Sequence, residues 1–206
     1  MIADRKGRGH ITVGFSSYQE FGVQRFLAEI SKVQLDLYAR QFSTALDRVE
    51  RMWPEFSHSM MRRVQLCRIH AYHHSGYAYL AVAACSDADQ RQSALRQASG
   101  YARALEKEAI EWAWPFAAYI RASIQYLEGN HSAAITDLNR AIKGFEKTGM
   151  RLYSSASQRR LGQALGGDAG NDQVASAEAV FSEQGVLDPA RLACMMAPAF
   201  GDMSER

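Results

Sequence analysis

The feature that most constrains the fold is the stretch Ala113–Thr148, in which two helical patterns flank a tight break at Gly129-Asn130. In the second pattern the apolar residues recur so that all of them fall on one face of a helix with 3.6 residues per turn. They are Ala134, Ile135, Leu138, Ala141, Ile142 and Phe145. The first pattern has one stripe, formed by Phe116, Ile120, Ile124 and Leu127. The stretch therefore predicts two antiparallel helices joined by a short turn, which is the unit of helical-repeat proteins.

Small residues occur where the two predicted helices would approach each other. They are Ala122 in the first helix, Gly129 in the turn, and Ala134 and Ala141 in the second helix, with Leu138 between them. Small side chains let two helices pack tightly, and larger ones fill the space between the small pairs. This pattern resembles a tetratricopeptide repeat, whose unit has about 34 residues. The resemblance implies an all-α, right-handed stack of antiparallel helical hairpins, with about nine helices in this chain.

The same alternation of apolar stripes and breaks extends over most of the chain. We expect a flexible segment at residues 1–15, one helical-repeat domain at 16–200 and a tail at 201–206. The hairpins are predicted at about 17–53, 60–109, 113–148 and 151–184, followed by a short helix at 188–197 that caps the stack.

Local signals set the boundaries of these elements. The capping box Ser17-x-x-Glu20 is expected to start the first helix, and Trp53-Pro54 to end the second. The pair Gly166-Gly167 should end the helix that begins near Arg151. Asp188-Pro189 combines an N-cap residue with a proline at the first helical position, which predicts the start of the last helix.

Composition narrows the classes of function. A net charge of +2 on 206 residues is too small to indicate nucleic acid or an anionic membrane as a partner. The three cysteines, Cys67, Cys85 and Cys194, are far apart and fit a reducing cytoplasm without disulfides. The most apolar run, Tyr77–Cys85, is shorter than the roughly 20 residues that span a bilayer. A cytoplasmic protein that binds neither membrane nor nucleic acid is therefore expected.

Three segments carry a second resemblance. They are SMMRRVQLCRIHAY at 59–72, LYSSASQRRLGQALGG at 152–167 and DPARLACMMAPAF at 188–200. They resemble the C-terminal region of large bacterial signalling proteins in which a serine/threonine protein kinase domain and an ATPase module precede tetratricopeptide-like helices. The resemblance implies a regulatory or scaffolding role.

Catalytic motifs are absent from the sequence. It contains no kinase glycine-rich loop, H-R-D or D-F-G motif, and no phosphate-binding loop before Lys147-Thr148. We therefore expect neither an enzyme nor a bound cofactor.

Binding to a protein or peptide, or to other domains of the same protein, is the leading functional hypothesis. The inner face of the first helix in the hairpin 113–148 would carry Phe116, Tyr119, Ser123 and Tyr126. Aromatic side chains with polar tips bury a large area at low entropic cost and still form hydrogen bonds. The alternative is that Phe116 packs against the preceding hairpin and that the two tyrosines only border the core.

The main alternative function is a metal- or ligand-sensing domain. Cys67, His70 and His74 have the spacing i, i+3, i+7, which places a thiol and two imidazoles on one helix face, with His73 beside them. Such groups bind zinc and other soft metals, although zinc sites usually take ligands from two elements. The competing interpretation is a partly exposed helix flank whose histidines form ordinary hydrogen bonds.

The first helix raises the question of self-association. If upstream repeats normally cover Ser17–Arg40, then Phe21 and Phe26 would lie on an exposed apolar face of this chain. Exposed apolar patches of this kind promote contacts between copies.

Overall fold

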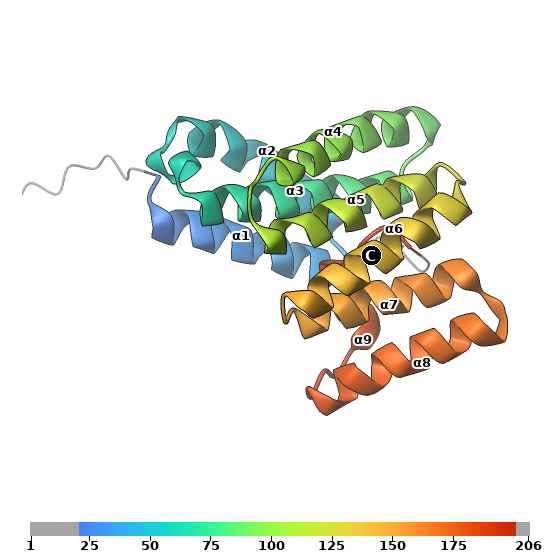
Figure 1. Ribbon diagram of the computed structural model, residues 1–206. Coiled ribbons are helices and arrows are strands. Elements are labelled where there is room, and N and C mark those ends of the chain that lie inside the picture. The colour runs from blue at the N-terminus through green and yellow to red at the C-terminus, as the bar shows by residue number, and fades with distance from the viewer. Residues whose placement is uncertain (1–20, 201–206) are drawn as a thin grey trace, which may run out of the picture.

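The computed structural model describes residues 21–200, and within them every regular element is a helix (Figure 1). The α-helices are α1 (Val23–Tyr38), α2 (Phe42–His58), α3 (Gln65–Cys85), α4 (Ala88–Glu106), α5 (Trp114–Leu127), α6 (His131–Lys147), α7 (Arg151–Leu165), α8 (Gly167–Glu183) and α9 (Pro189–Met196). Two short 3₁₀ helices precede α3 and α5, at Met60–Arg63 and Glu111–Ala113. The predicted all-α fold is confirmed. The expected capping box, the N-terminal segment 1–15 and the tail 201–206 lie outside the described residues.

The helices form successive antiparallel hairpins. Each of α1, α3, α5 and α7 packs on the helix that follows it, and α6 also packs on α7. Gly129 ends α5 with φ +84°, a conformation that glycine adopts without steric cost. The backbone N–H of Asn130 then donates to the carbonyl oxygen of Gln125 over 2.8 Å, which closes the turn. The hairpin α5–α6 therefore has the short connection that its sequence predicts.

Helix α1 begins at Val23, after the extended residue Gly22, and not near Ser17 as predicted. Two later boundaries also differ from the prediction. Helix α2 runs through Pro54 to His58 instead of ending at Trp53. The ring of Trp53 lies 5.5 Å from the ring of Phe56 and 5.3 Å from that of Tyr101, measured between centroids. These contacts stabilise the helical turn around Pro54 against the cost of a proline within a helix.

Helix α8 begins at Gly167, so the second glycine of the predicted break already belongs to the next helix. Gly170 in its first turn lies against Gly162 of α7. A Cβ atom added to Gly162 would lie 2.5 Å from the carbonyl oxygen of Gly170. The backbones of α7 and α8 approach each other too closely here for a side chain, and this explains the glycines Gly162 and Gly170 within the two helices.

The core consists of one large cluster that runs through the stack and a smaller one at its N-terminal end. Phe26 lies in the smaller cluster and is fully buried, with its ring stacked on Phe56 at 5.3 Å. The prediction that Phe26 is uncovered is therefore wrong, and Phe21 is partly buried. The large hydrophobic residues of α1 that do remain exposed are Val23, Leu27 and Leu35. In the described part of the chain, no helix has the length and apolar character required to cross a membrane.

The last helix does not cap the end of the stack. Helix α9 contacts α1, α7 and α8. Residues 197–200, which follow it, contact Tyr119 and Tyr126 of α5. We call the side of α1, α5 and α7 that faces these residues the inner surface. The predicted role of α9 as a terminal cap is corrected, because its apolar face is buried against this inner surface.

Candidate functional site

The predicted binding residues of α5 do not form an open groove. Phe116, Tyr119 and Ser123 are buried, and Tyr126 is partly buried. The ring of Phe116 stacks on His73 at 3.9 Å and meets the edge of Phe145 at 5.0 Å, so this residue belongs to the core. The hydroxyl of Ser123 donates to the carbonyl oxygen of Tyr119 within the same helix. The prediction of an accessible groove is therefore wrong for Phe116, Tyr119 and Ser123, and the alternative for Phe116 is correct.

The two tyrosines lie where an inner groove was expected, but the chain's own C-terminal residues cover them. The hydroxyl of Tyr119 donates to the carbonyl oxygen of Pro198 over 2.5 Å. Burial raises the pKa of Tyr119, so the hydroxyl keeps its proton for this bond. The ring of Phe200 lies 4.3 Å from Tyr126 and 6.1 Å from Tyr119. Residues 197–200, which we call the C-terminal strap, thus occupy the inner surface of α5.

Arg160 of α7 holds the same strap from the other side. Its side chain is fully buried, and its Nε donates to the carbonyl oxygen of Ala197 over 2.7 Å. One terminal nitrogen donates to the carbonyl oxygen of Phe200 at 3.0 Å and to Oε1 of Gln163 at 2.8 Å. Ala199, between these two carbonyl groups, has φ +88°, which is uncommon for a residue other than glycine.

Arg160 was not predicted to be a functional residue. Helical spacing is the sequence signal that could have indicated its burial, because Arg160 continues the stripe of Leu152 and Ala156 at intervals of four residues.

The histidines of α3 form a compact buried group that differs from the predicted one. Nitrogen atoms of His70, His73 and His74 lie within 4.8 Å of one another, and Cys67 is not part of this group. Cys67 instead packs in the smaller core cluster. The predicted set Cys67, His70 and His74 is therefore corrected, with His73 in place of the thiol.

The environment of these histidines is apolar. His73 and His74 are each 2% exposed, and burial lowers the pKa of both, to about 4 for His74. His70 is partly buried and its pKa is lowered by the same cause. His70 also lines an open hollow of about 680 Å³ between the N-terminal ends of α3 and α7. Its other lining residues are Leu66, Ile110, Glu111, Trp112, Phe116, Lys147, Thr148, Met150 and Tyr153.

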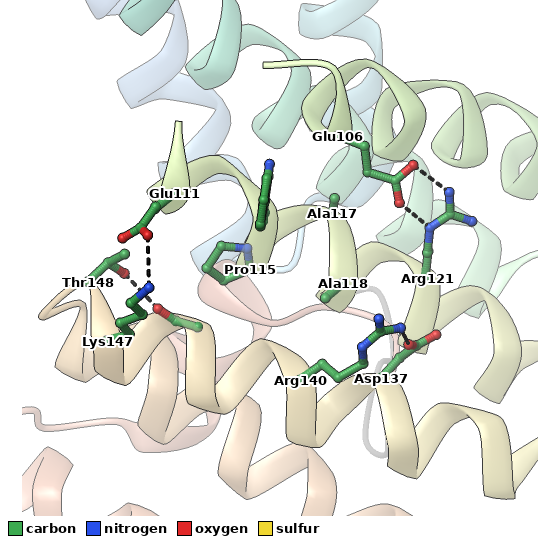
Figure 2. Close-up of a pocket in the computed structure, with 12 residues that line it drawn as sticks. Glu106, Glu111, Pro115, Ala117, Ala118, Arg121, Asp137, Arg140, Lys147 and Thr148 are labelled. Atoms are coloured by element: carbon green, nitrogen blue, oxygen red, sulfur yellow. Dashed lines mark hydrogen bonds and ion pairs between the residues drawn. The ribbon is translucent and has the colours of Figure 1, made fainter. Parts of the chain in front are cut away.

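A second hollow, of about 370 Å³, lies between α5 and α6. Figure 2 shows ion pairs on both sides of it, Glu106 with Arg121 and Glu111 with Lys147. Trp114 lines the same hollow with 58% of its surface exposed. The charged side chains drawn in Figure 2 all form ion pairs with one another. This hollow therefore contains no unpaired charged group that would select a particular ligand.

Comparison with known proteins identifies no relative. No family model matches the chain, and neither a curated protein nor a solved structure matches it.

Proposed function

We propose that the chain is a non-catalytic protein-interaction and regulatory scaffold module, and that it forms the C-terminal part of a cytoplasmic bacterial kinase/ATPase signalling protein. One observation carries this proposal: the inner surface holds a non-helical peptide segment, the C-terminal strap, through side chains that bind its backbone. Tyr119 and Arg160 donate to the carbonyl oxygens of Ala197, Pro198 and Phe200. A surface that binds backbone carbonyl groups suits a peptide ligand.

The contacts of the strap also describe the partner. A competing segment needs a non-helical backbone with free carbonyl groups and an aromatic residue that can take the place of Phe200 against Tyr126. Aromatic anchors in such pockets supply much of the affinity of peptide complexes. The partner is therefore a peptide or a segment of another domain of the same protein, and it binds by replacing the strap.

Cleavage of the loop before α9 tests this proposal on the intact fold. Leu187 is 98% exposed, so a protease recognition sequence inserted after it should be cut without disturbing the helices. After cleavage, the fragment that begins at Asp188 should stay bound and should exchange with an added labelled peptide of the same sequence. Fluorescence anisotropy measures its Kd, and circular dichroism reports whether residues 21–187 remain helical.

Two variants of the added peptide sharpen the test. Phe200→Ala should weaken binding at least tenfold, because the ring contacts with Tyr119 and Tyr126 are lost. Arg191→Gln should weaken binding far less than Phe200→Ala does, since Arg191 pairs with Asp188 of the same fragment and its contact with the stack is a partly exposed one, 6.0 Å from the ring centroid of Tyr38. If the stack unfolds when the fragment leaves, or if Phe200→Ala binds unchanged, the strap is part of the core and the proposal fails.

A further inference from the structure

The histidine group of α3 contains buried nitrogen atoms that no protein group satisfies. Nε2 of His73 and Nε2 of His74 are both buried, and neither has a hydrogen-bond partner. Buried polar atoms in folded proteins are almost always paired, so each exception calls for an explanation. Two such atoms on adjacent residues, beside the ring of His70, point to a shared ligand.

The hydrogen bond of His74 determines which of its nitrogens can bind that ligand. Its Nδ1 lies 2.8 Å from the carbonyl oxygen of His70, which can only accept, so Nδ1 carries the proton. In a neutral imidazole, Nε2 then has the free lone pair. A backbone carbonyl that fixes the tautomer in this way is a common support for metal-binding histidines.

We propose that His70, His73 and His74 together bind one divalent transition-metal ion, with zinc as the reference metal. Imidazole nitrogens suit zinc, copper and nickel, and three histidines leave a fourth position for another ligand. The hollow beside His70 provides access for the ion. Water in this hollow supplies the fourth ligand.

Binding requires the rings to move closer. Nitrogens that share a tetrahedral zinc ion at 2.0–2.1 Å are about 3.3 Å apart, whereas these lie within 4.8 Å of one another. His73 is confined by the rings of Phe116 and Tyr77, at 3.9 and 4.3 Å. His70 is only partly buried, and its ring is the one that can turn towards the other two.

Calorimetric titration of the full chain, without an affinity tag, with Zn²⁺ tests this site. One ion should bind per chain, with a Kd in the micromolar range or below. His70→Ala should weaken zinc binding at least tenfold. His70 is chosen because its side chain is the least buried of the three histidines. His58→Ala and His131→Ala are matched controls, because both histidines are exposed and lie outside the cluster. These two variants should bind zinc as the parent chain does.

A spectroscopic measurement keeps the test decisive if His70→Ala changes the fold. In the parent chain, Co²⁺ should give the visible absorption of a tetrahedral site, and Zn²⁺ should remove it by competition. Nitrogen-15 spectra should show selective shifts of the ring nitrogens of His73 and His74. No stoichiometric binding, unchanged binding by His70→Ala, or loss of binding in His131→Ala would overturn the proposal. None of these outcomes bears on the strap, which contacts other residues.

Discussion

Arg160 and the pair His73 and His74 are polar groups buried in the same stack, yet their surroundings differ. Arg160 donates to two backbone carbonyl groups of the strap and to Gln163. The two histidines are surrounded by aromatic rings, and each keeps one nitrogen without a partner. The hydrogen-bonding groups of the guanidinium thus find partners within the chain, whereas one nitrogen of each imidazole does not.

This difference separates two kinds of buried polar site. An arginine stays charged at any ordinary pH, so burying it requires hydrogen-bond acceptors, and the strap provides them. A histidine can lose its charge, so it tolerates an apolar environment as the neutral form with a free lone pair. The first site therefore holds a segment of the chain itself. The second leaves lone pairs for the ion that we propose it binds.

The largest expected effect is that of removing the buried guanidinium. Arg160→Met leaves the carbonyl oxygens of Ala197 and Phe200 buried without donors, each at a cost of about 1–3 kcal/mol. We expect the free energy of unfolding to fall by about 3 kcal/mol, as measured by urea denaturation. Cleavage by protease near Leu187 should become faster, since the strap is released. A loss below about 1 kcal/mol would show that the strap contributes little to stability.

The next effect concerns the neutral histidines. Burial lowers the pKa of His74 to about 4, and that of His73 lies well below its ordinary value. In the unfolded chain both take up a proton near pH 6.5. The unfolded state therefore binds more protons as the pH falls below about 6.5, and stability decreases by about 1.4 kcal/mol per pH unit for each histidine.

We expect the free energy of unfolding to be about 2–3 kcal/mol lower at pH 5.5 than at pH 7.5, in metal-free buffer. Carboxylates change little in this range. The control is His73→Phe, which keeps a ring beside Phe116 and should reduce this difference by about half. A flat profile between these two pH values would mean that the histidines are already protonated or exposed.

The smallest effect belongs to an arginine that is not buried. Arg121 forms an ion pair with Glu106 at the rim of the hollow in Figure 2, and both side chains are about 40% exposed. Because solvent screens such pairs, Arg121→Met should lower the free energy of unfolding by at most about 0.5 kcal/mol. Urea denaturation of this variant beside Arg160→Met compares the two arginines directly. Equal losses would contradict the distinction between a satisfied buried charge and a screened surface charge.

Helical periodicity was enough to predict most of the elements. The boundaries of α6 and α7 follow from their apolar stripes and from the glycines at their ends, because both signals are local. Pro54 shows the limit of such signals, since the aromatic contacts of Trp53 keep α2 helical where the local signal predicts an end. Gly170 shows the same limit, because the contact that requires it comes from another helix.

The candidate sites were predicted less well than the fold. Spacing placed His70 and His74 on one face of α3, but it could not show that Cys67 packs in a separate cluster while His73 joins the group. Spacing also placed Tyr119 and Tyr126 on the inner surface, but not the strap that covers them. Which side chain meets which neighbour depends on contacts between segments far apart in the chain.

The sequence by itself determined that this protein is built of helices and where most hairpins turn, because the 3.6-residue period and the turn glycines act over a few residues. Only the tertiary structure decided that α9 crosses the inner surface, that Arg160 is buried, and that two histidine nitrogens remain unpaired. The physical reason is the same in each case. Burial and hydrogen-bond satisfaction are properties of the packed chain, in which Arg160 and Phe200 become neighbours across 40 residues.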